Sequence, residues 1–134
     1  MVDPHHLAHE AGRRGELPIE ETERLIASDK VEGTGVFDRD GRSLGSVSNV
    51  MIDKFTGKVA YVVLSFGGFL GLGERYHPLP WRALSYDTRI GGFVVTTTKE
   101  QLEQAPSYAA AESPWTDPQF GRRVYDYYNV PWYF

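Results

Sequence analysis

The chain has 134 residues, a net charge of −4 and 41% hydrophobic residues, which predicts one domain with flanking segments. It contains no cysteine, and this excludes a disulfide framework or a Cys-based zinc site. The sequence shows neither a run of about 18 apolar residues nor an apolar signal segment at its start, so we expect a cytoplasmic protein. No basic stripe is visible, and we expect no nucleic-acid partner.

The first third of the chain carries weak structural signals. Residues 1–16 are polar and aperiodic, which predicts disorder. Residues 17–32 fit either one or two helical turns or an extended segment, because Pro18 and two glutamates stand where a helix would begin. We leave both alternatives open.

Residues 35–98 have a pattern typical of about six short strands. Turn signals separate the apolar runs at residues 38–41, 54–57 and 87–92, each with a glycine available for positive φ. This spacing predicts a small antiparallel barrel or sandwich. Residues 59–66, "VAYVVLSF", are apolar at almost every position. A strand of this kind needs cover on both faces, from the barrel interior and from a helix, the C-terminal tail or a second chain.

A glycine-rich segment, "GGFLGLG" at residues 67–73, follows the apolar strand. Gly68 and Gly73 have the spacing of a phosphate-binding loop, but Glu74 and Arg75 stand where that loop needs Lys and Ser or Thr. We therefore expect no nucleotide and no other cofactor. The segment has three large apolar residues, Phe69, Leu70 and Leu72, which could form a plug on the barrel mouth or a partner contact. Of the two, we expect the contact and predict that these three residues bind a protein partner.

The C-terminal end carries clear helix signals. Thr98 followed by Gln101 fits a capping box for a short helix that Pro106 ends, and Asp117-Pro118 predicts a second helix that runs to about Tyr128. Nine of the 18 aromatic residues lie between Tyr108 and Phe134, which is unusual for a disordered end. We expect this tail to pack on its own barrel or on that of a twin chain. The tail residues predicted to bind a partner are Tyr127, Tyr128, Trp132, Tyr133 and Phe134.

The histidines and aspartates offer little chemistry. His77 fits a packed or surface side chain better than a catalytic base, although a proton-sensitive role is open. His5 and His9 could bind a metal only on a helix; in a disordered tail they are a loose chelator. The aspartates at positions 38, 40 and 53 stand in predicted turns, and the sequence around them lacks the series of ligands that a calcium-binding loop needs. We predict no catalytic site and no metal site.

The segment "GTGVFDRDGRSLGSVSNVMIDKFTGKVAYVVLSFGGFLGLGERYHPLPWRALSYD" resembles the PRC-barrel family. Its most specific pieces are "DRDGRSLGSV", "VAYVVLSFGGFLGLGE" and "PLPW". This fold occurs in the cytoplasmic domain of the photosynthetic reaction centre H subunit, and a similar barrel occurs in a ribosome maturation factor. The tail "RRVYDYYNVPWYF" is also similar to stand-alone bacterial members.

The resemblance implies a mainly β protein, a small antiparallel PRC β-barrel with short flanking helices at the C-terminal end. We divide the chain into a disordered or weakly structured segment (1–26), the PRC-barrel domain (27–98) and a helical, aromatic-rich extension (99–134). The implied function is a non-catalytic protein-binding or assembly module, a homodimeric cytoplasmic adaptor. Two alternatives stay open: a membrane-peripheral module, or a factor associated with the ribosome or RNA processing.

Overall fold

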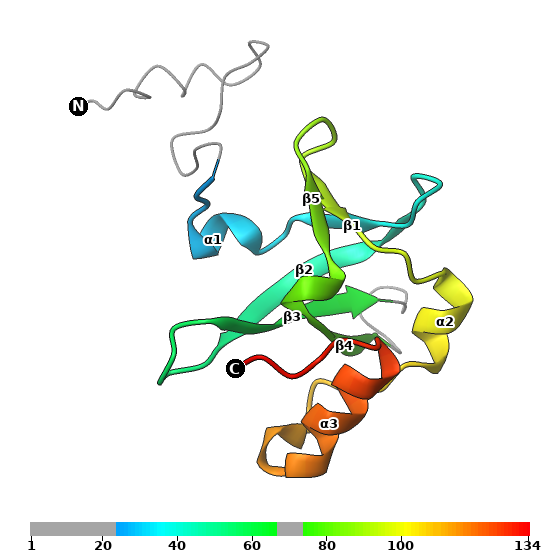
Figure 1. Ribbon diagram of the computed structural model, residues 1–134. Helices are drawn as coiled ribbons and strands as arrows, with labels where there is room; N and C mark the ends of the chain where they lie inside the picture. Colours follow the sequence, from blue (N-terminus) through cyan, green and yellow to red (C-terminus); the bar gives the residue numbers. More distant parts are fainter. Residues whose placement is uncertain (1–23, 67–73) are drawn as a thin grey trace, which may run out of the picture. The chain divides into compact units, whose positions relative to one another are not determined.

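The computed structural model describes residues 24–66 and 74–134. It divides into two units, of which the first is described over residues 24–31 and the second begins at residue 32. In the first unit, α1 (Ser28–Val31) is a single helical turn in which the N–H groups of Lys30 and Val31 donate to the carbonyl oxygen of Ala27. The second unit holds all the other elements (Figure 1).

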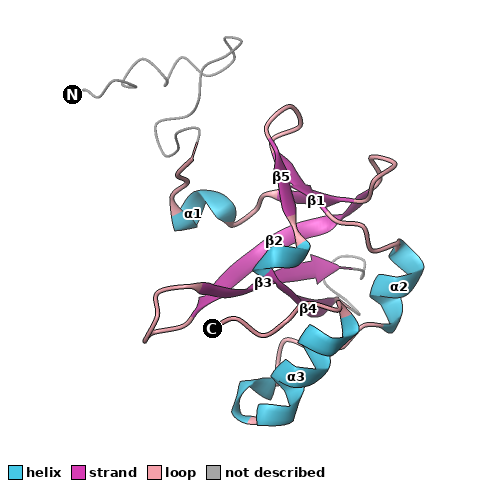
Figure 2. Cartoon of the chain, in the orientation of Figure 1, coloured by secondary structure: helices cyan, strands magenta, loops and turns pink. Residues whose placement is uncertain are grey.

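The second unit is built on one β-sheet (Figure 2). The strands of the described residues are β1 (Gly35–Phe37), β2 (Ser43–Ile52), β3 (Val59–Phe66), β4 (Arg75–Pro80), β5 (Ser85–Asp87) and β6 (Gly92–Val94). Their order in the sheet is β4-β3-β2-β1-β6-β5. The prediction of a mainly β domain of about six short strands is therefore confirmed.

The sheet differs from the predicted antiparallel barrel in two ways. It is mixed, because β1 pairs with β6 in parallel while the other neighbours are antiparallel. It is also not closed, since β4 and β5 form the two ends of the strand order. The residues at these ends give a physical reason. β4 contains Pro78 and Pro80, which have no N–H to donate to a further strand, and β5 has only three residues.

Local turn chemistry shapes the β1–β2 connection as predicted. The Asp38 carboxylate accepts hydrogen bonds from the N–H groups of Asp40 and Arg42, both at 2.9 Å, and Gly41 has a φ of +85°. Gly45, within β2, has a φ of +136°, and a Cβ there would overlap the carbonyl oxygen of Ser65 on β3. Only glycine lets the two strands approach this closely.

The helices at the C-terminal end also begin where the sequence predicted. Thr98 and Gln101 form the capping box of α2 (Lys99–Gln104), with reciprocal hydrogen bonds of 2.9 and 3.1 Å. Asp117 caps α3 (Pro118–Tyr127) by accepting from the Gln119 N–H at 2.9 Å. Two short 3-10 turns complete the unit, η2 (Trp81–Ala83) and η3 (Pro114–Thr116). Among the helices of the described residues, none is long and apolar enough to span a membrane.

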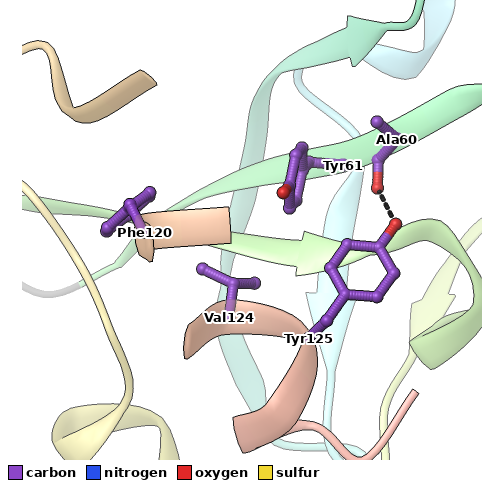
Figure 3. Close-up of a cluster of buried hydrophobic side chains, with 5 residues drawn as sticks. All are labelled: Ala60, Tyr61, Phe120, Val124 and Tyr125. Atoms are coloured by element: carbon purple, nitrogen blue, oxygen red, sulfur yellow. Dashed lines mark hydrogen bonds between the residues drawn. The ribbon is translucent and has the colours of Figure 1, made fainter. Parts of the chain in front are cut away.

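The centre of β3 is buried, with Val62, Val63 and Leu64 at 1% exposure or less. At its N-terminal end a second cluster forms where α3 packs on the strand (Figure 3). This cluster consists of Ala60, Tyr61, Phe120, Val124 and Tyr125. At this end of the strand, the predicted cover is thus supplied by α3 and the tail of the same chain.

Candidate protein-binding groove

A hydrogen-bonded turn joins β2 to β3 and presents one large apolar side chain. Asp53 Oδ2 accepts from the Thr56 N–H at 2.9 Å, the Gly57 N–H donates to the Asp53 carbonyl at 2.8 Å, and Gly57 has a φ of +78°. Hydrogen bonds from the Thr56 side chain and backbone hold the pKa of Asp53 below its usual range. At the tip of this ordered turn, Phe55 is 96% exposed.

The end of α3 turns the chain back towards β3. Asn129 adopts a φ of +58°, the left-handed conformation that commonly ends a helix, and the Val130 N–H donates to the Tyr125 carbonyl at 3.1 Å. The tail that follows is fastened to the strand: the Tyr133 hydroxyl donates to the Val59 carbonyl at 2.7 Å, and Lys58 Nζ donates to the Tyr133 carbonyl at 3.2 Å.

Two further contacts hold α3 and the tail in place. The buried Tyr125 hydroxyl donates to the Ala60 carbonyl at 2.7 Å (Figure 3). The Arg82 guanidinium lies 4.1 Å from the centre of the Tyr133 ring, a cation–π contact. Burial raises the pKa of Tyr125 far above its usual value, which keeps its hydroxyl protonated as a donor.

The last residues form an aromatic stack on this support. The rings of Trp132 and Phe134 are stacked with centroids 4.3 Å apart, and Trp132 Nε1 donates to the Phe134 carbonyl at 2.7 Å. Gly121 of α3 allows this arrangement. A Cβ at this position would lie 2.6 Å from the Tyr61 hydroxyl oxygen and 3.3 Å from the Trp132 ring. The ring of Trp132 therefore lies close over α3 but is still 50% exposed.

The β2–β3 turn, α3 and the tail form the sides of an open groove of about 340 Å³. Six aromatic residues line it: Phe55, Tyr61, Trp115, Phe120, Trp132 and Phe134. The charged side chains of its lining are Asp53, Lys54 and Asp117. Asp53 and Asp117 are engaged in capping the turn and α3, so the groove offers apolar contact area rather than acid–base chemistry.

Only some of the predicted site residues line this groove. Phe69, Leu70 and Leu72 lie outside the described residues. Trp132 and Phe134 line the groove. Tyr127 is 41% exposed and donates its hydroxyl to the Gln101 carbonyl at 2.5 Å, and Tyr133 is fastened to β3 as described above.

Tyr128 is turned inward. Within the described part of the chain its buried hydroxyl has no hydrogen-bond partner, and desolvation raises its pKa. The sequence analysis missed Phe55, Trp115 and Gly121. A signal for Phe55 was available, because a large aromatic residue at the tip of a hairpin turn has no neighbours to cover it.

His77 is a packed side chain at 3% exposure, with its ring edge-on to Phe66 at 5.3 Å. Among the described residues its Nδ1 has no hydrogen-bond partner. Burial, with a smaller contribution from the charge of Arg75, lowers its pKa to about 4. Two carboxylates that a catalytic histidine could use as partners, Glu74 and Asp87, are engaged elsewhere: Glu74 accepts from Ser65, and Asp87 pairs with Arg89 at 3.1 Å. In the described part of the chain, no group of three or more acidic, His or Cys side chains could hold a metal ion.

Comparison with known proteins identifies the family. The model of the PRC-barrel domain matches residues 23–102, more than half of the chain. The chain belongs to the PRC-barrel family. The β2–β3 turn, Ala60 and Tyr61 lie within the matched region, whereas η3, α3 and the tail lie beyond it. The groove is thus shared between the PRC-barrel domain and the extension that follows.

One solved structure that this PRC-barrel protein resembles is a putative 16S ribosomal RNA processing protein, RimM, from Pseudomonas aeruginosa. The identity is 21% and the TM-score 0.39, and the match covers 63% of this chain and 50% of that one. The chain therefore spans about half the length of that protein. No curated protein sequence matches the chain significantly.

Proposed function

We propose that this PRC-barrel protein is a non-catalytic binding and assembly module of the cytoplasm, which contacts a protein partner through the aromatic groove. One observation carries the proposal: a 96% exposed phenylalanine stands on a hydrogen-bonded turn at the rim of an open aromatic groove. Isolated exposed apolar residues are common, but a contiguous apolar patch with a polar rim is typical of an interaction site.

The energetics support a contact at this position. Full burial of one phenylalanine side chain is worth about 1.5–3 kcal/mol, and hot spots of protein interfaces are enriched in aromatic residues. Ile52 and Trp132 lie beside Phe55 along the groove and are 52% and 50% exposed. A partner that covered all three would bury apolar surface already held in position by the turn and the tail stack, which reduces the entropy lost on binding.

The proposal is tested by comparing two surface variants in a capture experiment. Phe55→Ser removes the exposed ring from the groove, and Ile90→Ser removes an apolar side chain that is 49% exposed on the β5–β6 turn, outside the groove lining. Tagged full-length protein is incubated with an extract of the native organism, and bound proteins are quantified. We expect Phe55→Ser to lose partners that wild type and Ile90→Ser retain. Equal capture by all three proteins would contradict the proposal.

Lipid is the competing occupant of an exposed aromatic patch. Flotation of the same three proteins with vesicles that contain anionic lipid distinguishes the two roles. The protein-binding role predicts no flotation of wild type. Flotation of wild type that Phe55→Ser abolishes would instead support the membrane-peripheral alternative.

A further inference from the structure

The surface around the groove carries both a projecting side chain and a hollow. Phe55 projects from the β2–β3 turn with almost no contact to its own chain, since it is 96% exposed. The hollow beside it has a volume of about 340 Å³. An apolar cavity of about 150 Å³ is enough to bind benzene. The groove can therefore accept one phenyl ring together with a neighbouring aliphatic side chain.

The chemistry of the hollow matches the projecting residue. The walls are the rings of Tyr61, Trp115, Phe120, Trp132 and Phe134, several of which already make edge-to-face or tilted contacts with one another, such as Tyr61–Trp115 at 5.1 Å and Trp115–Phe120 at 5.7 Å. An additional ring in such a cluster gains the same offset and edge-to-face contacts. The groove thus suits an aromatic side chain better than an aliphatic one.

The groove lining carries both signs of charge, Lys54 and two carboxylates, of which Asp53 accepts a hydrogen bond within its own turn. Lys54 precedes Phe55 on the turn, and Asp117 stands at the start of α3 on the opposite wall. Asp117 is 52% exposed on its side chain, and its ion pair with Arg123 is long, at 3.8 Å. A protein segment with a lysine followed by an aromatic residue would therefore contact both the apolar walls of the groove and the carboxylate of Asp117.

We propose that the occupant of the groove is the β2–β3 turn of a second copy of this chain. The two copies are related by a two-fold axis, so that each Phe55 enters the groove of the other and each Lys54 faces the Asp117 of the other. An interface with two-fold symmetry requires a surface that is complementary to itself, and this patch holds the projecting ring, the hollow, the cation and the carboxylate together. The inference rests on the proposed function and names its partner.

The size of the contact sets the expected strength. Each phenylalanine brings about 150–250 Å² of its own surface, and Ile52 and Trp132 are only half exposed. The interface therefore lies at the small end of the range for specific complexes. We expect a reversible dimer with a dissociation constant on the order of micromolar, which is populated as the protein concentration rises.

The test is sedimentation equilibrium of the full-length protein over a range of concentrations. We expect Phe55→Ser to raise the dimer dissociation constant by at least about tenfold. Its melting temperature should equal that of wild type at concentrations where wild type is monomeric, because the ring is exposed in the single chain. Lys54→Glu should raise it several-fold, since it places a carboxylate opposite Asp117. The matched controls are Ile90→Ser for loss of an apolar side chain and Lys99→Glu, on α2, for the same change of charge. Both controls should dimerise like wild type.

A second measurement locates the contact. Protein carrying p-benzoylphenylalanine at position 55 is mixed with isotopically heavy wild type and irradiated. We expect cross-links between light and heavy chains that map to residues 115–121 or 130–134. A wild-type protein that stays monomeric at all concentrations would overturn the inference, as would a dimer that Phe55→Ser does not weaken, or cross-links that map elsewhere.

The outcomes also separate this inference from the proposed function. If Phe55→Ser abolishes capture of another protein while self-association is absent or unaffected, the groove binds a different partner and only the dimer is wrong. If Phe55→Ser changes neither capture nor self-association, both the proposed protein-binding function and the proposed dimer are wrong.

Discussion

Acidification should destabilise this protein through His77. The side chain is 3% exposed, and burial lowers its pKa from 6.5 to about 4. Between these two values the unfolded chain binds a proton at this position and the folded protein does not. The free energy of unfolding therefore falls as the pH is lowered from about 6.5 towards 4, and the stabilisation is fully present only above this window.

The magnitude follows from the difference between the two pKa values. One pKa unit corresponds to about 1.4 kcal/mol, so the complete effect is about 3 kcal/mol, and linkage gives about 2 kcal/mol of it by roughly pH 5. This is a substantial part of the stability of a small domain. The carboxyl groups of Asp38, Asp53 and Asp87, whose pKa values are lowered by hydrogen bonds in the native state, lose their contribution only at lower pH.

The assay is urea denaturation of wild type and His77→Leu at a series of pH values between 7 and 4.5. The variant loses the titrating group, so its stability should change much less across this range. Any packing cost of the leucine shifts the whole curve and leaves its slope unchanged. Parallel curves for the two proteins would refute the reasoning, because they would mean that His77 takes up a proton as readily in the folded protein as in the unfolded chain.

Three further substitutions test the packing. Gly121→Ala should lower the free energy of unfolding by about 1–3 kcal/mol, because its Cβ meets Tyr61 and Trp132, although alanine is the better helix former. Arg122→Ala, at an exposed position, is the control. A gain in stability for Gly121→Ala would contradict the close approach. Tyr125→Phe should cost about 1 kcal/mol in urea denaturation through loss of the hydrogen bond to Ala60, and no change would show that the bond is not formed. Gly45→Ala should cost at least about 3 kcal/mol by the same measurement, because its Cβ overlaps the carbonyl of Ser65; a cost below about 1 kcal/mol would be incompatible with this packing.

The features predicted correctly from the sequence depend on neighbours within a few residues. The hairpin turn at Asp38, the capping box of Thr98 and the cap of Asp117 each join groups two to four positions apart. Their side chains bond to nearby backbone in a way that the residue types already indicate. Such interactions involve only residues close together in the sequence, which is why the sequence suffices to predict them.

The prediction of a closed sheet was wrong because the pairing of strands depends on residues far apart in the sequence. The parallel pair of β1 and β6 joins Val36 to Phe93, far apart along the chain, and each strand has only three residues. A strand of three residues carries almost no periodic pattern, so its residue types predict neither its direction nor the strand with which it pairs. The Pro78 and Pro80 pair did carry the relevant signal, since proline in a strand indicates an edge.

The groove shows the same division between local and long-range information. The aromatic density of the tail was enough to predict that it packs, and the packing on β3 confirms this. Which strand it covers depends on the reversal at Asn129 and on the closeness that Gly121 allows. Phe55 was counted only as part of a turn, because turn chemistry accounts for its neighbours Asp53 and Gly57. Its place at the tip, where no neighbour covers the ring, was the signal that it is exposed.

The origin of the groove decides which experiments can probe it. One wall comes from the β2–β3 turn within the PRC-barrel match, and the other from α3 and the tail beyond residue 102. Deletion of residues 115–134 would remove the second wall and would also uncover Ala60 and Tyr61, which are 3% and 5% exposed with the tail in place. Loss of binding in such a truncation would not distinguish a missing contact surface from an unstable sheet. Phe55 avoids this ambiguity because its side chain contributes almost nothing to the folded chain, so any effect of its removal on association reports on the groove itself.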